Sequence, residues 1–149
     1  DGGSLCDMGS HNHPMYGSVS AWFYKYLAGI QVDEEKPGYE SFTVKPQIIG
    51  DLEYVNCIIK TVRGMVISKW KAIGNTLRME IGVPWNSQAR VWVPIKELDA
   101  DNVIIQEGEE IIWEGGRFIS GAYGVHRGEV CNRHIIFTIG SGIYIFTRK

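Results

Sequence analysis

The spacing of hydrophobic residues along the chain changes once, near residue 32. Within residues 12–30 they recur at steps of three and four, which predicts a helix with one apolar stripe. The stripe consists of Val19, Trp22, Phe23, Tyr26, Leu27 and Ile30. Asn12 or His13 is expected to cap this helix, Pro14 suits its first turn, and Gly29 marks its last turn. No other segment has a convincing helical pattern.

A charged connector that contains Pro and Gly, residues 32–39, separates this helix from a region in which the period is two. Leu77, Met79, Ile81 and Val83 alternate with polar or small residues, as in a strand with one buried and one wet face. Similar runs predict strands at residues 42–44, 52–62, 65–72, 89–93, 103–106, 111–113, 134–139 and 143–147. The pairs at 74–75 and 141–142 are residue types that reach positive φ, and they predict tight hairpins between antiparallel neighbours.

Many short strands with regular turns predict a mainly β chain, an antiparallel β-sandwich of Greek-key or jelly-roll type preceded by one α-helix. A sandwich does not require that helix, and a lone helix would leave its aromatic stripe in water. We therefore expect residues 1–31 to belong to a partly missing helical domain. Residues 32–41 are then a linker, and residues 42–149 form the sandwich.

Composition narrows the function classes. With 149 residues and 44% hydrophobic content the chain can bury one proper core. Its net charge of −2, without a basic face, argues against nucleic acid as a partner. No run approaches the roughly 20 apolar residues of a membrane helix, and the first residues lack the features of a signal peptide. Cytoplasmic and exported locations both stay open.

The cysteines and histidines do not predict a metal site. Cys6, Cys57 and Cys131 are odd in number and widely spaced, so we interpret them as small buried hydrophobic residues. Two groupings contain zinc-binding residue types, but neither spacing matches a ligand signature. The groupings are Cys6 with His11 and His13, and His126 with Cys131 and His134. We expect no metal and no cofactor.

Residues 10–30 resemble the bacterial α-L-rhamnosidases of glycoside hydrolase family 78. The resemblance rests on the Asn12-His13 pair, a glycine one turn later, an aromatic cluster, and a closing Leu-Ala-Gly-Ile at 27–30. Pro37-Gly38-Tyr39 and Lys45-Pro46 then precede a β-rich tail. The resemblance implies that the helix is the last one of an (α/α)₆-barrel catalytic domain, beginning at its active-site end. The β-sandwich is then an accessory domain that follows the barrel.

Such enzymes release terminal α-L-rhamnose with inversion, using two carboxyl groups about 6.5–9.5 Å apart. The resemblance places both groups upstream of this chain, so we expect the chain to be inactive by itself. The adjacent acidic pairs Glu34-Glu35 and Glu109-Glu110 are expected to be solvated surface. The implied partners are a rhamnose-containing carbohydrate and the remainder of the barrel. The apolar stripe also predicts a homodimer of the isolated chain through the helix.

By the same resemblance, His13 binds the substrate by hydrogen-bonding a sugar hydroxyl, the alternative being that it only caps the helix. Asn12 orients the loop or His13, the alternative being that it serves as an ordinary N-cap. Trp92 keeps a rival function open. If Ala89, Val91 and Val93 face inward, Trp92 faces outward, where it contacts either another domain or a carbohydrate. The rival is a non-catalytic carbohydrate-binding module.

Overall fold

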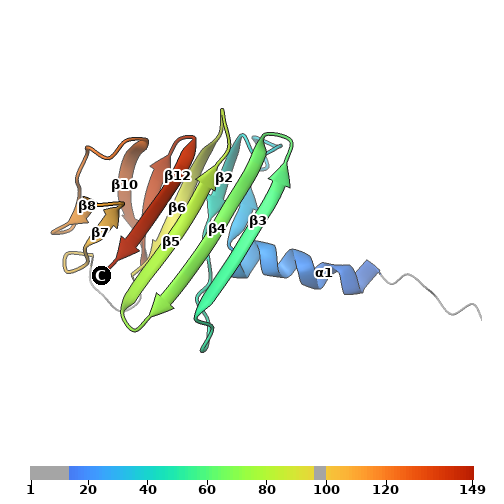
Figure 1. The fold of residues 1–149 in the computed structure, drawn as a ribbon, viewed down its shortest axis with the longest axis horizontal. Coiled ribbons are helices and arrows are strands. Elements are labelled where there is room, and N and C mark those ends of the chain that lie inside the picture. Colours follow the sequence, from blue (N-terminus) through green and yellow to red (C-terminus); the bar gives the residue numbers. More distant parts are fainter. Residues whose placement is uncertain (1–13, 96–99) are drawn as a thin grey trace, which may run out of the picture.

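The computed structural model describes residues 14–95 and 100–149, which form two facing β-sheets with a helical segment projecting from one edge (Figure 1). The helical segment is α1 (Pro14–Trp22), continued by the π-helical turn η1 (Phe23–Leu27). The strands are β1 (Ile30–Val32), β2 (Ser41–Val44), β3 (Tyr54–Thr61), β4 (Gly64–Ile73), β5 (Thr76–Val83), β6 (Gln88–Pro94), β7 (Ile105–Glu107), β8 (Glu110–Glu114), β9 (Arg117–Phe118), β10 (Val125–Cys131), β11 (His134–Ile139) and β12 (Gly142–Arg148). None of the helices in these ranges is long and apolar enough to cross a membrane.

The strand order is β1-β2-β6-β11-β10 in the first sheet, here sheet A, and β3-β4-β5-β12-β7-β8-β9 in the second, sheet B. The predicted mainly β sandwich is confirmed. Its strand pairs are antiparallel except for β2 and β6, which run parallel. Parallel neighbours need a long crossover connection. Here the chain leaves β2, forms β3, β4 and β5 in sheet B, and returns to sheet A as β6.

The core lies between the sheets and follows the predicted alternation. Leu77, Met79, Ile81 and Val83 on β5 are all buried, and so are Ala89, Val91 and Val93 on β6. Aromatic rings join the two layers at the centre, because Phe137 of sheet A stacks on Phe146 of sheet B with centroids 5.5 Å apart. Burial of these apolar side chains is the main force that holds the sheets together.

One buried cation also links the two sheets. The Arg148 side chain is 1% exposed and lies on the inner side of β12. Its guanidinium donates to the carbonyl of Pro94 in sheet A at 2.8 Å and to the carbonyl of Asn75 in the β4–β5 turn at 2.5 Å. Burial lowers its pKa, because a charge is less well solvated inside the protein.

The two predicted hairpins have different outcomes. Gly74 and Asn75 do join the antiparallel neighbours β4 and β5, with Ile73 opposite Thr76. The hairpin prediction for Ser141 and Gly142 is wrong, because β11 belongs to sheet A and β12 to sheet B. A positive-φ glycine suits a tight hairpin and a connection between sheets equally well, so turn residues alone do not distinguish the two.

The helix ends earlier than predicted. Helical structure stops at Leu27, Gly29 has a φ of +75°, and Ile30 begins β1 instead of closing the helix. Val32 pairs with Phe42, so the predicted linker is largely the loop of a β1–β2 hairpin. The strands β1, β9 and β10 were not predicted from the sequence. Ile30 is buried in the core as a strand residue. Its spacing also fits the helical stripe, so the hydrophobic pattern does not show where the helix ends and the first strand begins.

Candidate functional site

The projecting helix exposes hydrophobic side chains to solvent. Val19, Trp22, Phe23 and Tyr24 are 53%, 43%, 49% and 47% exposed, and Figure 1 shows α1 pointing away from both sheets. The Trp22 ring contacts Phe23 and Tyr26, with centroids 5.6 and 5.7 Å away. We call Val19, Trp22, Phe23 and Tyr24 the helix surface. Val19, Trp22 and Phe23 of the predicted stripe thus lack cover, whereas Tyr26 and Leu27 are half-buried and Ile30 is buried. The helix surface is suited to a further protein layer.

The other end of the helical segment is bound firmly to the sandwich. The last carbonyl groups of a helix have no partner within the helix and need one elsewhere. Here the Tyr26 carbonyl accepts a hydrogen bond from the backbone N–H of Gln47 at 2.9 Å. The Leu27 carbonyl accepts one from the indole Nε1 of Trp70 at 2.8 Å, and the Trp70 side chain is buried on β4.

The next two carbonyl groups along the chain are held in the same way. The Ala28 carbonyl accepts a hydrogen bond from the Ser68 hydroxyl at 2.7 Å, and both residues are buried. The Gly29 carbonyl accepts one from the backbone N–H of Lys45 at 2.8 Å. Four consecutive carbonyls are therefore bonded to residues that follow β2 or lie on the inner face of β4. We call this set of contacts the helix junction, and it fixes the direction in which the helix leaves the sandwich.

Gly29 allows the chain to turn at the helix junction. Its φ of +75° strains a residue that has a side chain, and a Cβ there would lie 2.1 Å from the carbonyl carbon of Lys45. The backbones of the helix exit and of the segment after β2 therefore touch at Gly29. A pattern of hydrophobic residues marks Gly29 as a helix end but does not reveal this second contact.

Among the residues singled out from the sequence, Asn12 and His13 lie outside the described residues. Trp92 faces outward on β6, as the alternation predicts, but it is half-buried. The Lys45 ammonium lies 3.9 Å from the centre of its ring, and His134 packs edge-on with a centroid distance of 5.5 Å. Such a cation–π contact is worth about 0.5–2 kcal/mol. The cover that Trp92 needs is thus supplied in part by the chain itself.

The environment of Trp92 also affects His134. Burial lowers the pKa of its imidazole below 6.5, and the nearby positive charge of Lys45 lowers it further. The indole Nε1 of Trp92 is buried without a hydrogen-bond partner. This corner of sheet A therefore favours a neutral imidazole near neutral pH and leaves one donor unused.

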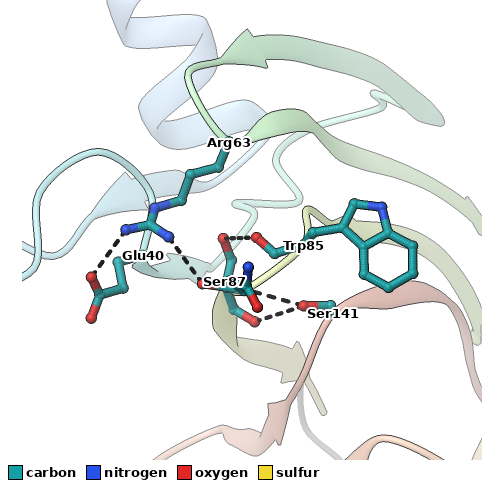
Figure 2. A network of polar contacts seen from close by, with 6 residues as sticks. Glu40, Arg63, Trp85, Ser87 and Ser141 are labelled. Atoms are coloured by element: carbon teal, nitrogen blue, oxygen red, sulfur yellow. Dashed lines mark hydrogen bonds and ion pairs between the residues drawn. The ribbon is translucent and has the colours of Figure 1, made fainter.

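Trp85, which the sequence analysis does not single out, is 84% exposed. The following residue, Asn86, has a φ of +53°. Arg63 stabilises this turn by donating to the Asn86 carbonyl at 3.2 Å, and it also pairs with Glu40 at 3.0 Å (Figure 2). The pair is largely solvent-accessible, so it contributes little energy but fixes the position of the Arg63 side chain.

Ser87 and Ser141 hold the same turn from its other side. The Ser141 hydroxyl donates to the Ser87 carbonyl at 3.3 Å and accepts from the Ser87 N–H at 3.4 Å. The Ser87 hydroxyl donates to the Trp85 carbonyl at 3.4 Å, and in Figure 2 the indole points away from this network. An exposed indole on a braced turn is suited to contact another molecule or domain.

The acidic pairs are solvated, whereas the prediction of buried cysteines holds for Cys57 and not for Cys131, which is half-buried. Cys6 lies outside the described residues. Glu34, Glu35, Glu109 and Glu110 are exposed, as predicted for solvated surface. Cys57 is buried, and burial raises the pKa of its thiol. In residues 14–95 and 100–149, no three His, Cys, Asp or Glu side chains come together in a way that could hold a metal ion.

Comparison with known proteins gives a consistent result. The sequence profile of the bacterial alpha-L-rhamnosidase C-terminal domain matches residues 29–106, more than half of the chain. An alpha-L-rhamnosidase from Streptomyces avermitilis is 27% identical over 148 residues, which are 99% of this chain and 12% of that protein. The chain spans about a tenth of the length of the curated relatives it matches.

Solved structures share the fold. The alpha-L-rhamnosidase from Dictyoglumus thermophilum matches with a TM-score of 0.76 and 35% identity, over 94% of this chain and 14% of that one. The Streptomyces avermitilis alpha-L-rhamnosidase complexed with L-rhamnose matches with a TM-score of 0.69 and 25% identity, over 91% of this chain and 11% of that one. The resemblance noted in the sequence is confirmed, and the chain belongs to the bacterial alpha-L-rhamnosidase C-terminal domain family.

Proposed function

We propose that this chain is the carboxy-terminal region of an α-L-rhamnosidase, and that its sandwich is a non-catalytic support for the last helix of the catalytic domain. The observation that carries the proposal is the helix junction, at which four consecutive carbonyls are bonded to the sandwich. A helix that is fixed at one end and exposes the four hydrophobic side chains of the helix surface is suited to pack against further helices. The remainder of the barrel is the proposed partner of the helix surface.

The acidic residues of the sandwich favour assigning hydrolysis to another domain. The acidic pairs Glu34-Glu35 and Glu109-Glu110 each consist of adjacent, exposed residues. Inverting hydrolysis needs two separated carboxyl groups on either side of a sugar. We therefore assign the hydrolysis of terminal α-L-rhamnosyl bonds to the upstream domain of the parent. The sugar assignment is supported by the neighbouring structure solved with L-rhamnose.

Turnover of a chromogenic α-L-rhamnoside tests this division. The 149-residue chain is expected to release no chromophore, and the full-length parent is expected to hydrolyse the compound. A parent variant in which the helix surface carries Trp22→Ser and Phe23→Ser should lose thermal stability, because the lost apolar contacts are those with the barrel. Hydrolysis by the 149-residue chain alone would contradict the proposal.

Within the parent, His13 is proposed to bind substrate, and Asn12 to orient it. The support is the resemblance of the Asn12-His13 motif to the family. His13→Ala should lower kcat/KM while leaving the unfolding temperature nearly unchanged, because the lost contact is with the sugar. An N-cap gives the opposite pattern, a loss of about 1 kcal/mol of stability with unchanged kinetics. Asn12→Ala is the matched variant, with a smaller kinetic effect expected.

The isolated chain is proposed to form a homodimer through the helix surface, which lacks its partner domain. Sedimentation of the chain over a range of concentrations tests this, with the triple variant Val19→Ser, Trp22→Ser, Phe23→Ser as control. At concentrations at which the unsubstituted chain self-associates, the triple variant should stay monomeric. Removing the segment before Val32 would be a poor control, since Ala28 and Ile30 belong to the core. A chain that stays monomeric throughout argues against the dimer.

The rival function, a carbohydrate-binding module that uses Trp92, is less well supported. Lys45 lies over one face of the indole and His134 packs against it, so little of the ring is free to stack on a sugar. A contact between Trp92 and another domain of the parent remains the preferred role. Titration with rhamnose oligosaccharides, followed by tryptophan fluorescence in the chain and in Trp92→Phe, separates the two roles.

A further inference from the structure

The outer face of sheet B carries a row of side chains that the support function does not use. The pairing register places Tyr54 of β3 opposite Lys71 of β4, and Lys71 opposite Arg78 of β5. All three side chains are exposed, Tyr54 by 65%. They line a hollow of about 550 Å³ together with Asn56, Lys69, Ile73, Thr76 and Glu80. Hollows of this size are typical of small-ligand sites.

The charges in this row are arranged unfavourably for the protein alone. Lys71 and Arg78 lie directly opposite each other across two strands, and like charges in that position destabilise a sheet. In the neighbouring row Lys69 faces Glu80 and forms an ion pair with it at 2.8 Å. Neither Lys71 nor Arg78 takes part in any ion pair found in residues 14–95 and 100–149. The hollow is therefore locally positive on a chain whose net charge is −2.

Protection of a sheet edge does not explain these cations. Lysines on edge strands discourage pairing with other chains. However, β4 and β5 are interior strands of sheet B, since β3 lies outside β4 and β12 lies beyond β5. Lys71 and Arg78 thus occupy positions where a neutral or oppositely charged pair would stabilise the sheet more. A bound anion between them would remove the repulsion.

We propose that this hollow binds an acidic saccharide, a glycan that carries carboxylate or sulfate groups. The Arg78 guanidinium and the Lys71 ammonium contact the anionic group, since both side chains bind carboxylate and sulfate oxygens well. The exposed ring of Tyr54, next to Lys71, provides an aromatic face for the sugar, and Asn56 supplies a hydrogen-bonding amide. The saccharide class rests on the proposed role of the chain in a glycoside hydrolase; the anionic character rests on the charges alone.

Calorimetric titration of the 149-residue chain tests the proposal with three probes: tetragalacturonate for carboxylate, a sulfated carrageenan tetrasaccharide for sulfate, and neutral maltotetraose. Binding of either acidic probe, with none of maltotetraose, is expected. Lys71→Gln and Arg78→Gln should each weaken that binding about tenfold, the effect of losing one charge-assisted hydrogen bond. Lys60→Gln is the matched control, because Lys60 is exposed on the same face outside the hollow and should change the Kd less than about twofold.

A stability readout separates the ligand site from a merely structural one. Arg78→Gln should leave the unfolding temperature unchanged or raise it, because it removes the repulsion from Lys71. The proposal is overturned if neither acidic probe binds, if maltotetraose binds equally well, or if Lys60→Gln weakens binding as much as Arg78→Gln. A lower unfolding temperature of Arg78→Gln also counts against it. None of these results bears on rhamnoside turnover by the parent, so the two proposals fail independently.

Discussion

The substitution Gly29→Ala tests the helix junction most severely. The Cβ of an alanine would lie 2.1 Å from the carbonyl carbon of Lys45 and 2.2 Å from the nitrogen of Pro46, and the φ of +75° would have to be kept or abandoned. The left-handed conformation costs a residue with a side chain about 1–2 kcal/mol. Insertion of a methyl group against packed backbone costs about 1–3 kcal/mol more.

Together these terms give about 3 kcal/mol, a large part of the 5–15 kcal/mol that stabilises a typical domain. For a chain of this size each kcal/mol lowers the Tm by about 2–4 °C, so the Tm should fall by about 6–12 °C. Urea unfolding followed by circular dichroism measures the loss directly. Gly50→Ala is the matched control, since Gly50 has a φ of +56° but nothing within 4 Å of the added Cβ. Equal losses of unfolding free energy in the two variants would contradict the close backbone contact at Gly29.

Four further predictions follow from individual contacts. Trp70→Phe removes the donor to the Leu27 carbonyl and should cost about 1–3 kcal/mol in urea unfolding; an unchanged midpoint would contradict this role. Trp85→Ala should change stability by less than about 0.5 kcal/mol, since the side chain is largely solvent-exposed. Arg148→Met should cost about 1–3 kcal/mol because two carbonyls lose their donor, and equal or higher stability would refute the linking role. Titration of His134 by proton NMR should give a pKa below 6.5. Because the unfolded chain then binds more protons than the folded one, the stabilisation present above pH 6.5 is lost as the pH falls. A pKa above 6.5 would contradict the effect of burial on His134.

The sequence predicted the strands that contain a clear hydrophobic run, and it missed β1, β9 and β10. Residues 76–83 and 88–94 lie in the middle of their sheets, and buried residues alternate with more exposed ones along β6 and along residues 76–81 of β5. In contrast, β9 has two residues, and the register of β10 shifts between Val125 and Arg127. The burial of Arg148 was not predicted, because a hydrophobic pattern does not identify a buried cation, although Arg148 continues the inward alternation of β12.

Contacts between distant segments decide the parts that the sequence did not predict. The outward direction of Trp92 follows from its position on β6, but its cover by Lys45 depends on the parallel pairing of β2 with β6. In the same way, the hydrophobic stripe of the helix is predicted by the three- and four-residue spacing. The hydrogen bonds that hold the helix to the sandwich are not predicted by it, because Ser68 and Trp70 lie some 40 residues further along the chain. The proposed contact of His13 with substrate lies outside the described residues.

The proposed function requires that the sandwich hold the helix while the catalytic domain of the parent covers the helix surface. Hydrogen exchange of the amides of residues 19–27 measures that cover directly, in the 149-residue chain and in the full-length parent. We expect fast exchange toward Val19 in the chain, with protection only near the helix junction, and protection along the whole helix in the parent. Equally fast exchange of residues 19–25 in both proteins would contradict it.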